Sequence, residues 1–413
     1  MKLAVVVDQF PVLSQTFVLN QITGLIDLGI HVSIISLNQP EQSQKIHPLV
    51  TQYNLLEKNT YLLAEPKTKI SKAIYRLKNA LRACTIPKKR KLLINSLSAC
   101  YGAHGKSLLL ASIAYNLPKP LIFDVVLCHF GYNGILANNL RHLGLLKGKI
   151  ATIFHGHEVS AQQALLRYQK GYEALFNQTE LMLPISQLWE QKLISLGCSH
   201  HKIHVHRMGV NLDSFHVKTE GNKKKPTLTL FTAARFSEKK GLEFAIKALA
   251  LLPDEMKIRY ILAGYGELEQ YLKNLVNTLA LTKKVEFVGA LNQIEIAKYM
   301  RESDVFIQPS ITAENGDMEG VPVAIMEAMA SGIPVISTFH SGIPELITHG
   351  ETGLLSPEKD ELGLANNIKL LNEDIKLRDK LAYNARLRIE DIANVEKLNK
   401  ILVKRLTALG FDC

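Results

Sequence analysis

The chain contains little cysteine and no long apolar run. Its five cysteines are scattered without any C-x-x-C spacing, so the sequence indicates neither a zinc site nor a disulfide framework, and a reducing compartment fits best. No stretch reaches the ~18 uninterrupted apolar residues that a membrane-spanning helix needs. The first residues, MKLAVVVDQF, hold too short an apolar run for a signal peptide, so we interpret them as a strand. We expect a cytoplasmic protein, soluble or peripheral to a membrane.

Length and charge set the next limits. A chain of 413 residues exceeds one ordinary core, so two domains are expected. The net charge is +11, and it is unevenly placed. Residues 1–200 contain 21 Lys+Arg and 10 Asp+Glu, whereas residues 201–413 contain 28 of each. The whole excess of positive charge therefore belongs to the first half.

Most of that excess lies in residues 67–93, KTKISKAIYRLKNALRACTIPKKRKLL. Apolar residues recur there at helical spacing between the basic ones, as Ile70, Ile74, Leu77 and Leu81. A solvated helix face and a surface for an anionic membrane explain this pattern equally well. Nucleic acid is disfavoured as a partner, because no interleaved aromatic residues or recognised binding module accompany the charges.

Short β-branched runs alternate with helical patterns along the whole chain. The strands predicted by these runs span residues 2–8, 31–37, 124–130, 149–155, 180–186 and 202–208, then 227–235, 257–264, 284–290, 304–310 and 333–339. Strand and helix in alternation predict parallel sheets covered by helices on both faces. We expect an α/β protein with an N-terminal domain at 1–207, a C-terminal domain at 208–390 and a C-terminal helix at 391–413 that packs back on the first domain. The polar segment 214–227 is the best candidate for a linker.

Ligands of such sheets bind beyond the carboxyl ends of the strands. One candidate site there is EGVPVAIMEAMASG, residues 319–332, where Pro322 suits a first helical position. Glu319 then precedes the helix, and Glu327 lies about a turn and a half inside it among apolar neighbours. The free backbone N–H groups of Val323 and Ala324 can meet an anion.

A second candidate site follows the predicted strand 227–235. Arg235 ends that strand, and Lys239 and Lys240 precede the next helix. Cations oppose the dipole of a helix amino terminus unless an anion lies nearby. We therefore expect Arg235 and Lys240 to clamp a diphosphate, with arginine bound in bidentate fashion. Lys239 is about equally well explained as a solvated lysine.

A third candidate site lies in the first half, where His155 directly follows a strand. His157 and Glu158 come next, but no third ligand at suitable spacing appears, so a metal site is not indicated. His129, after the strand 124–130, is a weaker candidate of the same kind. A lone histidine in such a place is more often structural than functional.

These motifs resemble those of the retaining glycosyltransferases of family 4. The resemblance covers the second domain through Glu319-x₇-Glu327, RFSEKKG (235–241), ILAGYGE (261–267) and SGIPELI before GETGLL. FPVLSQTFV, CHFGYNG, FHGHEVS and RMGVNLDSF in the first half resemble the colanic-acid and amylovoran type of exopolysaccharide glycosyltransferase.

The resemblance implies a GT-B fold, in which two doubly wound Rossmann-like domains face each other across a cleft. It implies that Glu327 holds the ribose hydroxyls, that Glu319 touches the donor sugar, and that Gly264 and Gly320 belong to the donor site. Arg235 and Lys240 would neutralise the diphosphate and His155 would face the sugar, with no metal or other cofactor. Anomeric retention by front-face attack is also implied.

The first domain departs from the family pattern. Many relatives carry a glycine pair after the first strand, but DQFPVLSQTF stands there in this chain. We expect Ser14 to cap a helix with Thr16 in its first turn, and Ser14, Thr16, His129 and His157 to line the acceptor side.

The sequence thus predicts an enzyme that transfers a hexose from a nucleotide sugar to a lipid-linked saccharide in exopolysaccharide or surface-polysaccharide biosynthesis. UDP-galactose or UDP-glucose is the favoured donor, and a GDP-mannose-dependent mannosyltransferase is the alternative. The expected location is the inner face of the plasma membrane, held by the basic residues 67–93. A GT-B epimerase and a noncatalytic nucleotide- or polysaccharide-binding protein are the competing hypotheses.

Overall fold

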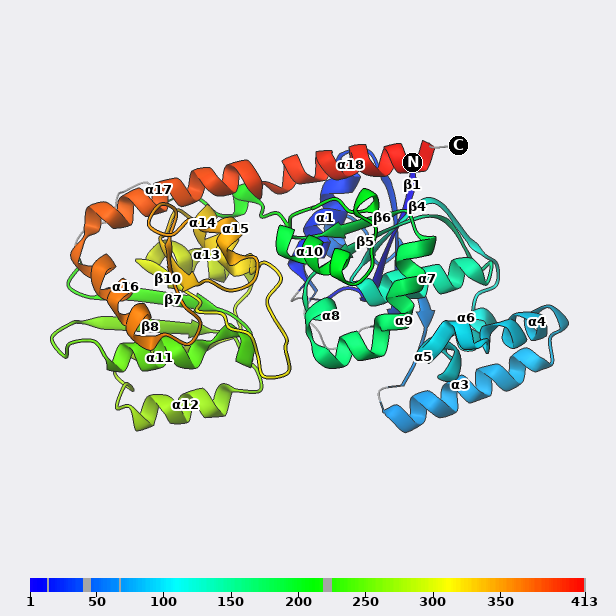
Figure 1. Ribbon diagram of the computed structural model, residues 1–413, viewed down its shortest axis with the longest axis horizontal. Coiled ribbons are helices and arrows are strands. Elements are labelled where there is room, and N and C mark those ends of the chain that lie inside the picture. The colour runs from blue at the N-terminus through cyan, green and yellow to red at the C-terminus, as the bar shows by residue number, and fades with distance from the viewer. Residues whose placement is uncertain (13–14, 40–45, 67, 218–224, 412–413) are drawn as a thin grey trace. The chain divides into compact units, whose positions relative to one another are not determined.

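The computed structural model describes residues 1–12, 15–39, 46–66, 68–217 and 225–411, and it divides into two compact units (Figure 1). The first unit comprises residues 1–185, 189–206 and the C-terminal segment from Asn399, and the second comprises 186–188 and 207–398. The chain thus passes from one unit to the other at His206–Arg207, ahead of the segment 214–227 that we predicted as the linker. Among the described residues, no helix is both long and apolar enough to cross a membrane.

The first unit is built on a six-stranded parallel sheet of order β3-β2-β1-β4-β5-β6. Its strands are β1 (Lys2–Gln9), β2 (His31–Asn38), β3 (Asn59–Leu63), β4 (Leu121–His129), β5 (Leu146–Phe154) and β6 (Leu181–Pro184). Its helices are α1 (Thr16–Asp27), α2 (Pro48–Gln52), α3 (Lys69–Cys84), α4 (Pro87–Ser96), α5 (Gly102–Lys106), α6 (Leu109–Asn116), α7 (Gly131–His142), α8 (His157–Ser160), α9 (Gln162–Gln178) and most of α10 (Gln187–Ser195). Five consecutive residues of β1, Leu3–Val7, are buried because this central strand is covered on both faces.

Two details of this sheet differ from the prediction. β3 was not predicted, because this edge strand is short and partly exposed. The strand predicted at 202–208 is absent: the segment runs beside β6 and forms only an isolated bridge from Ile203 to Met182. The N–H of His204 donates to Met182 O, but Pro184 has no N–H with which to return the next bond of a parallel ladder.

The second unit repeats the same topology. Its parallel sheet has the order β12-β11-β10-β7-β8-β9. The strands are β7 (Leu228–Ala233), β8 (Ile258–Ala263), β9 (Val285–Gly289), β10 (Val305–Ile307), β11 (Val335–Thr338) and β12 (Leu354–Ser356), the last a short edge strand that was not predicted. The helices are α11 (Leu242–Ala250), α12 (Glu269–Thr278), α13 (Gln293–Glu302), α14 (Val323–Ala330), α15 (Ile343–Leu346), α16 (Glu361–Glu373), α17 (Ile375–Ile392) and the start of α18 (Val395–Phe411).

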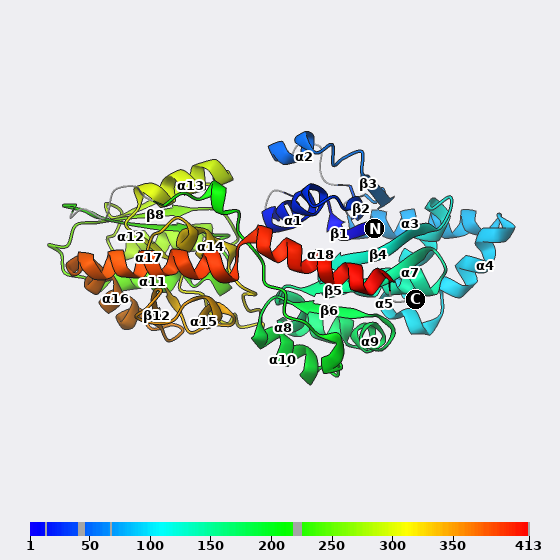
Figure 2. The same ribbon diagram turned by 90° about the horizontal axis from the view of Figure 1, so that it is seen from above.

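Helices cover both faces of this second sheet. α11 and α12 lie on one side, and α13, α14 and α17 lie on the other (Figures 1 and 2). A continuous apolar core joins the buried faces of β7, β8, α11, α12 and α16. The later part of α18 belongs to the first unit, where Arg405 donates from Nη1 to Val205 O at 3.0 Å. Both units are therefore doubly wound α/β folds, as predicted.

Each sheet reverses its strand order at one point, between β1 and β4 in the first unit and between β7 and β10 in the second. Doubly wound sheets bind ligands beyond the carboxyl ends of the strands at such a switch point. At the second switch point Gly241 has a left-handed φ of +62° and follows the short helix η4 (Glu238–Lys240). A Cβ at this position would overlap the carbonyl oxygen of Pro309, in the segment after β10. Glycine thus lets the loops after β7 and β10 approach each other.

We therefore expect Gly241→Ala to lower the free energy of unfolding by roughly 2–4 kcal/mol, because it adds both a steric overlap and left-handed backbone strain. Denaturant unfolding checks this value. Gly289→Ala is the matched control, because Gly289 has a similar φ of +73° but open space around its Cβ position. Equal losses in the two variants would contradict the close approach.

Candidate active site

The predicted donor-site residues gather at the carboxyl ends of the strands of the second unit. Arg235 follows β7, Lys240 ends η4, and Gly264 directly follows β8. The loop from β10 to α14 carries Glu319 and Gly320, and α14 carries Val323, Ala324 and Glu327. The switch-point rule thus places these residues where a ligand is expected.

An ion pair joins two of the predicted residues directly. Lys240 Nζ lies 2.9 Å from Glu319 Oε1, and both side chains are largely buried, at 17% and 8% exposed. Burial alone would raise the pKa of Glu319, but the ammonium groups of Lys240 and Lys239 outweigh it and hold that pKa below its usual value. Lys239 itself pairs with Asp317 at 3.1 Å. Glu319 is therefore a carboxylate at neutral pH.

Arg235 is not part of this pair. Its side chain is 65% exposed and lies 3.9 Å from Glu267 in a surface contact of little energetic value. No contact joins Arg235 to Lys240 or Glu319 in the described part of the chain. Of the two residues predicted to clamp a diphosphate, Lys240 is therefore buried and held by Glu319. Arg235 is exposed, so its guanidinium is accessible to an anion.

Sequence reasoning missed the residues that hold the Glu319 loop. His340, fully buried after β11, accepts the N–H of Glu319 at Nε2 (3.1 Å), and its Nδ1 donates to Glu358 (2.6 Å). Glu358 also accepts the N–H of Thr312 at 2.8 Å. Burial would raise the pKa of Glu358, but the bonds from Thr312 and His340 outweigh it and lower that pKa. The segment STFHSGIPELI was identified as a loop, but nothing in its spacing singled out the histidine.

The next two residues of that segment interlock with the same loop. Ser341 has a left-handed φ of +49° and donates from Oγ to Glu319 O at 2.6 Å. A Cβ on Gly342 would lie 3.0 Å from Gly320 O and 2.9 Å from a methyl of Val321. The loop after β11 therefore determines where Glu319 and Gly320 lie.

α14 begins one residue later than predicted. Pro322 is its N-cap and has an extended ψ of 116°, so Val323 is the first helical residue. Proline still suits this boundary, because it has no N–H to leave unpaired. The N–H groups of Val323 and Ala324 have no hydrogen-bond partner in the parts of the chain that the structure describes. They are free to bind an anion, as expected for a first turn.

Glu327 is a buried carboxyl that has no partner in the described part of the chain. Its side chain is 8% exposed, and no hydrogen bond or ion pair from a described residue reaches it. Burial raises its pKa to about 8. An unpaired buried carboxyl is costly, which suits a group that a ligand completes.

Gly264 has a structural explanation of its own. Its φ is +135°, and a Cβ there would overlap the carbonyl oxygen of Ala234. The glycine therefore permits the chain to pass close to the end of β7. A donor contact by Gly264 is not needed to explain this residue.

In the first unit, His129 and His155 form a stacked, hydrogen-bonded pair. His129 ends β4 and His155 follows β5; His129 Nδ1 lies 3.1 Å from His155 Nε2, with the rings 5.3 Å apart. Burial, and secondarily His206, lowers the pKa of His129 to about 3. Burial and then His129 hold the pKa of His155 well below its usual value. Both rings are neutral at pH 7, and one of them donates the shared proton.

Glu158 fixes the backbone beside this pair. Its Oε1 accepts the N–H of His155 at 2.8 Å and that of Gly131 at 3.4 Å, and the residue is fully buried. Burial raises its pKa despite these two bonds, which act in the opposite direction. Glu158 therefore positions the segments that carry His155 and α7 instead of joining His157 as a ligand.

Aromatic rings surround His155. Phe130 and Phe17 lie 4.4 and 5.0 Å from its ring, and Tyr132 stacks on Phe130 at 5.5 Å. The three rings are partly exposed. Such faces suit the apolar C–H surface of a sugar ring.

The remaining predicted residues of the first unit are placed less tightly. Thr16 begins α1 next to Phe17, and Gln15 is the N-cap, without a side-chain bond, in place of the predicted Ser14. Ser14 itself lies outside the described residues. His157 begins α8 and is exposed. No group of three or more His, Cys, Asp or Glu residues in the described ranges has the arrangement of a metal site.

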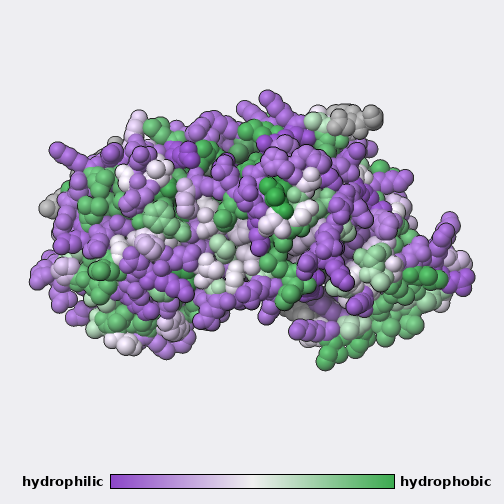
Figure 3. Space-filling model, viewed as in Figure 1, coloured by the Kyte–Doolittle hydropathy of each residue, from purple (hydrophilic) through white to green (hydrophobic). Residues whose placement is uncertain are grey.

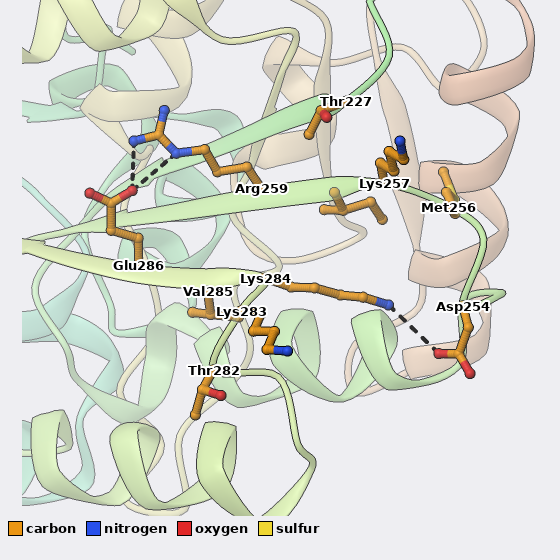
Figure 4. Close-up of a pocket in the computed structure, with 11 residues that line it drawn as sticks. Thr227, Asp254, Met256, Lys257, Arg259, Thr282, Lys283, Lys284, Val285 and Glu286 are labelled. Carbon is orange, nitrogen blue, oxygen red and sulfur yellow. Dashed lines mark hydrogen bonds and ion pairs between the residues drawn. The ribbon is translucent and has the colours of Figure 1, made fainter.

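A hollow at the opposite end of the second sheet is not part of this site (Figure 4). It lies where β7, β8 and β9 begin and is lined by residues such as Lys257, Arg259 and Lys284. Arg259 pairs there with Glu286 at 2.6 Å, and Lys284 lies 3.9 Å from Asp254. Because ligands of parallel sheets bind at the carboxyl ends of strands, we assign this hollow no role in the chemistry.

Comparison with solved structures shows the fold. HepE from Anabaena, solved with UDP and glucose, superposes with a TM-score of 0.71 at 18% identity and covers 99% of this chain and 100% of its own. Sucrose-phosphate synthase from Thermosynechococcus elongatus has a TM-score of 0.71 at 19% identity, with 99% of both chains covered. These likenesses show that the fold is GT-B, as predicted.

Comparison of sequences shows the family. The family model described as "Glycosyl transferases group 1" matches residues 214–388. The chain is 45% identical to the amylovoran biosynthesis glycosyltransferase AmsK of Erwinia amylovora, with 88% of this chain and 89% of AmsK covered. It is 40% identical to the colanic acid biosynthesis glycosyltransferase WcaL of Escherichia coli K12, with 99% and 100% covered. With its GT-B fold and this likeness along nearly its whole length, the chain belongs to the group 1 glycosyl transferases, in the family of these exopolysaccharide-biosynthesis glycosyltransferases.

Proposed function

We propose that the protein transfers a hexose from a nucleotide sugar, preferably UDP-galactose or UDP-glucose, to a lipid-linked oligosaccharide with retention of the anomeric configuration. The observation that carries this proposal is the buried Lys240–Glu319 pair beside the free amino terminus of α14. A cation, a carboxylate and two N–H donors in one region support the binding of a sugar diphosphate there. The solved complexes of HepE with UDP and with UDP-glucose support a uridine nucleotide as donor.

The proposed chemistry is a single substitution at the anomeric carbon. The bond from that carbon to the diphosphate oxygen breaks, and its electron pair leaves with the nucleoside diphosphate. An acceptor hydroxyl forms the new bond on the same face, and its proton passes to the departing phosphate oxygen. Arg235 and Lys240 stabilise the negative charge that grows on the diphosphate, so the protein's own cations do this work without a metal.

The two glutamates of the motif take different parts of the donor. We propose that Glu319, ionised and held by Lys240 and His340, accepts hydrogen bonds from hydroxyls of the hexose. Glu327, which no described residue pairs with, accepts hydrogen bonds from the ribose hydroxyls. The N–H groups of Val323 and Ala324 meet a phosphate oxygen. Neither glutamate serves as a nucleophile in this scheme.

The first unit is proposed to bind the acceptor. The neutral His155 hydrogen-bonds a sugar hydroxyl during transfer, and the partly exposed rings of Phe17, Phe130 and Tyr132 support a sugar face. An acceptor attached to a lipid requires the enzyme to work at a membrane. We propose that it does so peripherally, at the inner face of the plasma membrane, through the basic residues 67–93.

Arg235→Ala should lower kcat/KM of transfer by about 100-fold or more, because a cation aimed at the developing charge is lost. Release of nucleoside diphosphate, followed with and without acceptor, measures this. Arg259→Ala is the matched control, since this exposed arginine lies at the other end of the sheet and pairs with Glu286. An Arg235→Ala enzyme with full activity and unchanged donor affinity would refute the clamp.

His155→Ala should likewise abolish most transfer, whereas protonation of His155 should not limit the rate in wild type as the pH falls from 7.5 through 6.5. The reason is the lowered pKa of His155. Its ring stays neutral in the folded protein at pH 6.5, where a free histidine is half protonated, and becomes charged only at more acidic pH. A pH–rate profile of kcat/KM tests this. His201→Ala, which changes an exposed histidine, is the control. An inflection near pH 6.5 that disappears in His155→Gln would contradict the neutral role.

UDP binding should release a proton at pH 7. Glu327 has a pKa of about 8 in the free protein and is mostly protonated, and ribose hydroxyls that donate to it favour the carboxylate. Calorimetry with UDP in two buffers of different ionisation enthalpy measures this proton. Glu327→Gln should bind more weakly and release none. Heats independent of the buffer in wild type would contradict the ribose assignment, and tighter binding of GDP than UDP would favour the mannosyltransferase alternative.

A further inference from the structure

α3 turns its large apolar side chains toward solvent. Four aliphatic residues are 52–76% exposed: Ile70, Ile74, Leu77 and Leu81. At ~100° per residue, their positions lie within about 60° of arc around the helix, so they form one continuous stripe. We call these four residues the α3 stripe. A helix that belonged only to the protein's core would bury such a stripe.

The buried face of α3 consists of smaller residues. Asn79, Ala80 and Ala83 face inward. Asn79 donates to Ser112 Oγ at 2.7 Å, and the two alanines pack in a small cluster that includes Leu93 of α4. The helix is therefore already seated in the first unit by its small residues. The α3 stripe is not required for this packing.

The charge around the α3 stripe has one sign. Residues 68–97 contain nine Lys and Arg residues and no Asp or Glu. Arg76 pairs with Glu65, and Lys89 donates to the carbonyl of Tyr115. The other seven, which include the exposed Lys78 and Arg82, form no ion pair with a described residue. The helix thus presents apolar side chains and unpaired cations on the same exposed surface.

Neighbouring apolar residues extend the surface. Ile94 of α4 is 64% exposed and Leu97 just after it is 51% exposed. Hydrophobic residues gather over α3 in the space-filling view (Figure 3). Both ribbon views place α3 and α4 beyond the edge of the first unit's sheet (Figures 1 and 2). The surface is therefore accessible to a large, flat partner.

We propose that the α3 stripe is the surface by which this protein docks on a bilayer containing anionic phospholipids, with the stripe inserted at the level of the headgroups and the surrounding cations on the lipid phosphates. Aliphatic residues flanked by Lys and Arg are the composition of an interfacial helix. A second copy of the chain fits less well, because a symmetric contact would bring the unpaired cations together. Nucleic acid would use the cations but not the aliphatic stripe.

The position of α3 also agrees with the proposed acceptor side. Arg76 Nη2 donates at 2.9 Å to Glu65, which follows the carboxyl end of β3. His129 ends β4 and His155 follows β5, so both also lie at the carboxyl ends of the strands of this sheet. A bilayer held by α3 would therefore lie on the side from which a lipid-linked acceptor comes. This inference gives the proposed membrane association its surface, and its test measures lipid binding without any transfer reaction.

The first experiment is co-sedimentation with vesicles. We expect the wild-type chain to bind vesicles made of equal parts phosphatidylcholine and phosphatidylglycerol, and to bind phosphatidylcholine vesicles much more weakly. Replacing the α3 stripe by glutamine at all four positions should lower the partition coefficient by at least about tenfold. Leu166→Gln with Ile294→Gln is the matched control, because these helical residues are 80% and 81% exposed elsewhere. An unchanged thermal shift with UDP will show that the stripe variant is folded.

A fluorescence reporter tests insertion itself. The chain has one tryptophan, Trp189, which is 2% exposed and gives a constant background. Ile74→Trp should show a blue-shifted emission with the anionic vesicles, and Ile294→Trp should not.

The proposal fails if wild type does not bind the anionic vesicles, or if the stripe variant binds them as tightly as wild type. It also fails if the stripe variant only converts a dimer to a monomer, or if RNA and not lipid protects Ile74→Trp from an aqueous quencher. Loss of vesicle binding with intact transfer to a soluble acceptor would support the docking surface and the enzyme function separately.

Discussion

The buried ion pair of Lys240 and Glu319 is the contact on which the second unit's site depends. Two charged groups that are this far from water are stable only when each has its partner. The pair also joins two separate segments, the one after β7 and the one after β10, across the point where the strand order reverses. Gly241 makes the approach possible, since any side chain there would overlap Pro309. The electrostatic requirement thus determines the geometry of the loops.

Hydrogen bonds from the loop after β11 fix the position of Glu319. His340 receives the N–H of Glu319 and donates to Glu358, and Ser341 holds the carbonyl of Glu319. These bonds fix the main chain of Glu319, and Lys240 holds its carboxylate, so a ligand would need to order less of this loop. Arg235 is the opposite case, because its side chain is exposed and has only a weak partner, Glu267, among the described residues. The site thus combines a buried ion pair with one exposed cation.

The two units handle buried titratable groups differently. In the first, His129 and His155 are neutral because burial lowers their pKa values and each provides the other's hydrogen bond. In the second, Glu319 remains ionised beside Lys240, whereas Glu327 is mostly protonated at pH 7 and has no partner among the described residues. One carboxyl is thus paired within the protein, and the other is the candidate for a ligand contact.

Periodicity and turn signals were sufficient to predict much of the fold. Alternating strands and helices indicated two doubly wound units, because a parallel sheet covered on both faces requires near-continuous apolar strands such as Leu3–Val7. The edge strands β3 and β12 escaped this reasoning, since short edge strands carry little of that signal. The segment 202–208 does not form the expected strand, because Pro184 in the neighbouring β6 has no N–H to donate to it. That cause lies outside the segment's own sequence.

By itself, the sequence determined which residue types stand after which strands, and therefore the region of the candidate site at Arg235, Lys240 and Glu319. Only the tertiary structure decided that Lys240, and not Arg235, pairs with Glu319, and that His340 supports them. It also decided that the α3 stripe faces solvent, because helical spacing shows that four residues share a face but not which way that face turns. Pairing and exposure depend on contacts between segments distant in the chain, which local spacing does not encode.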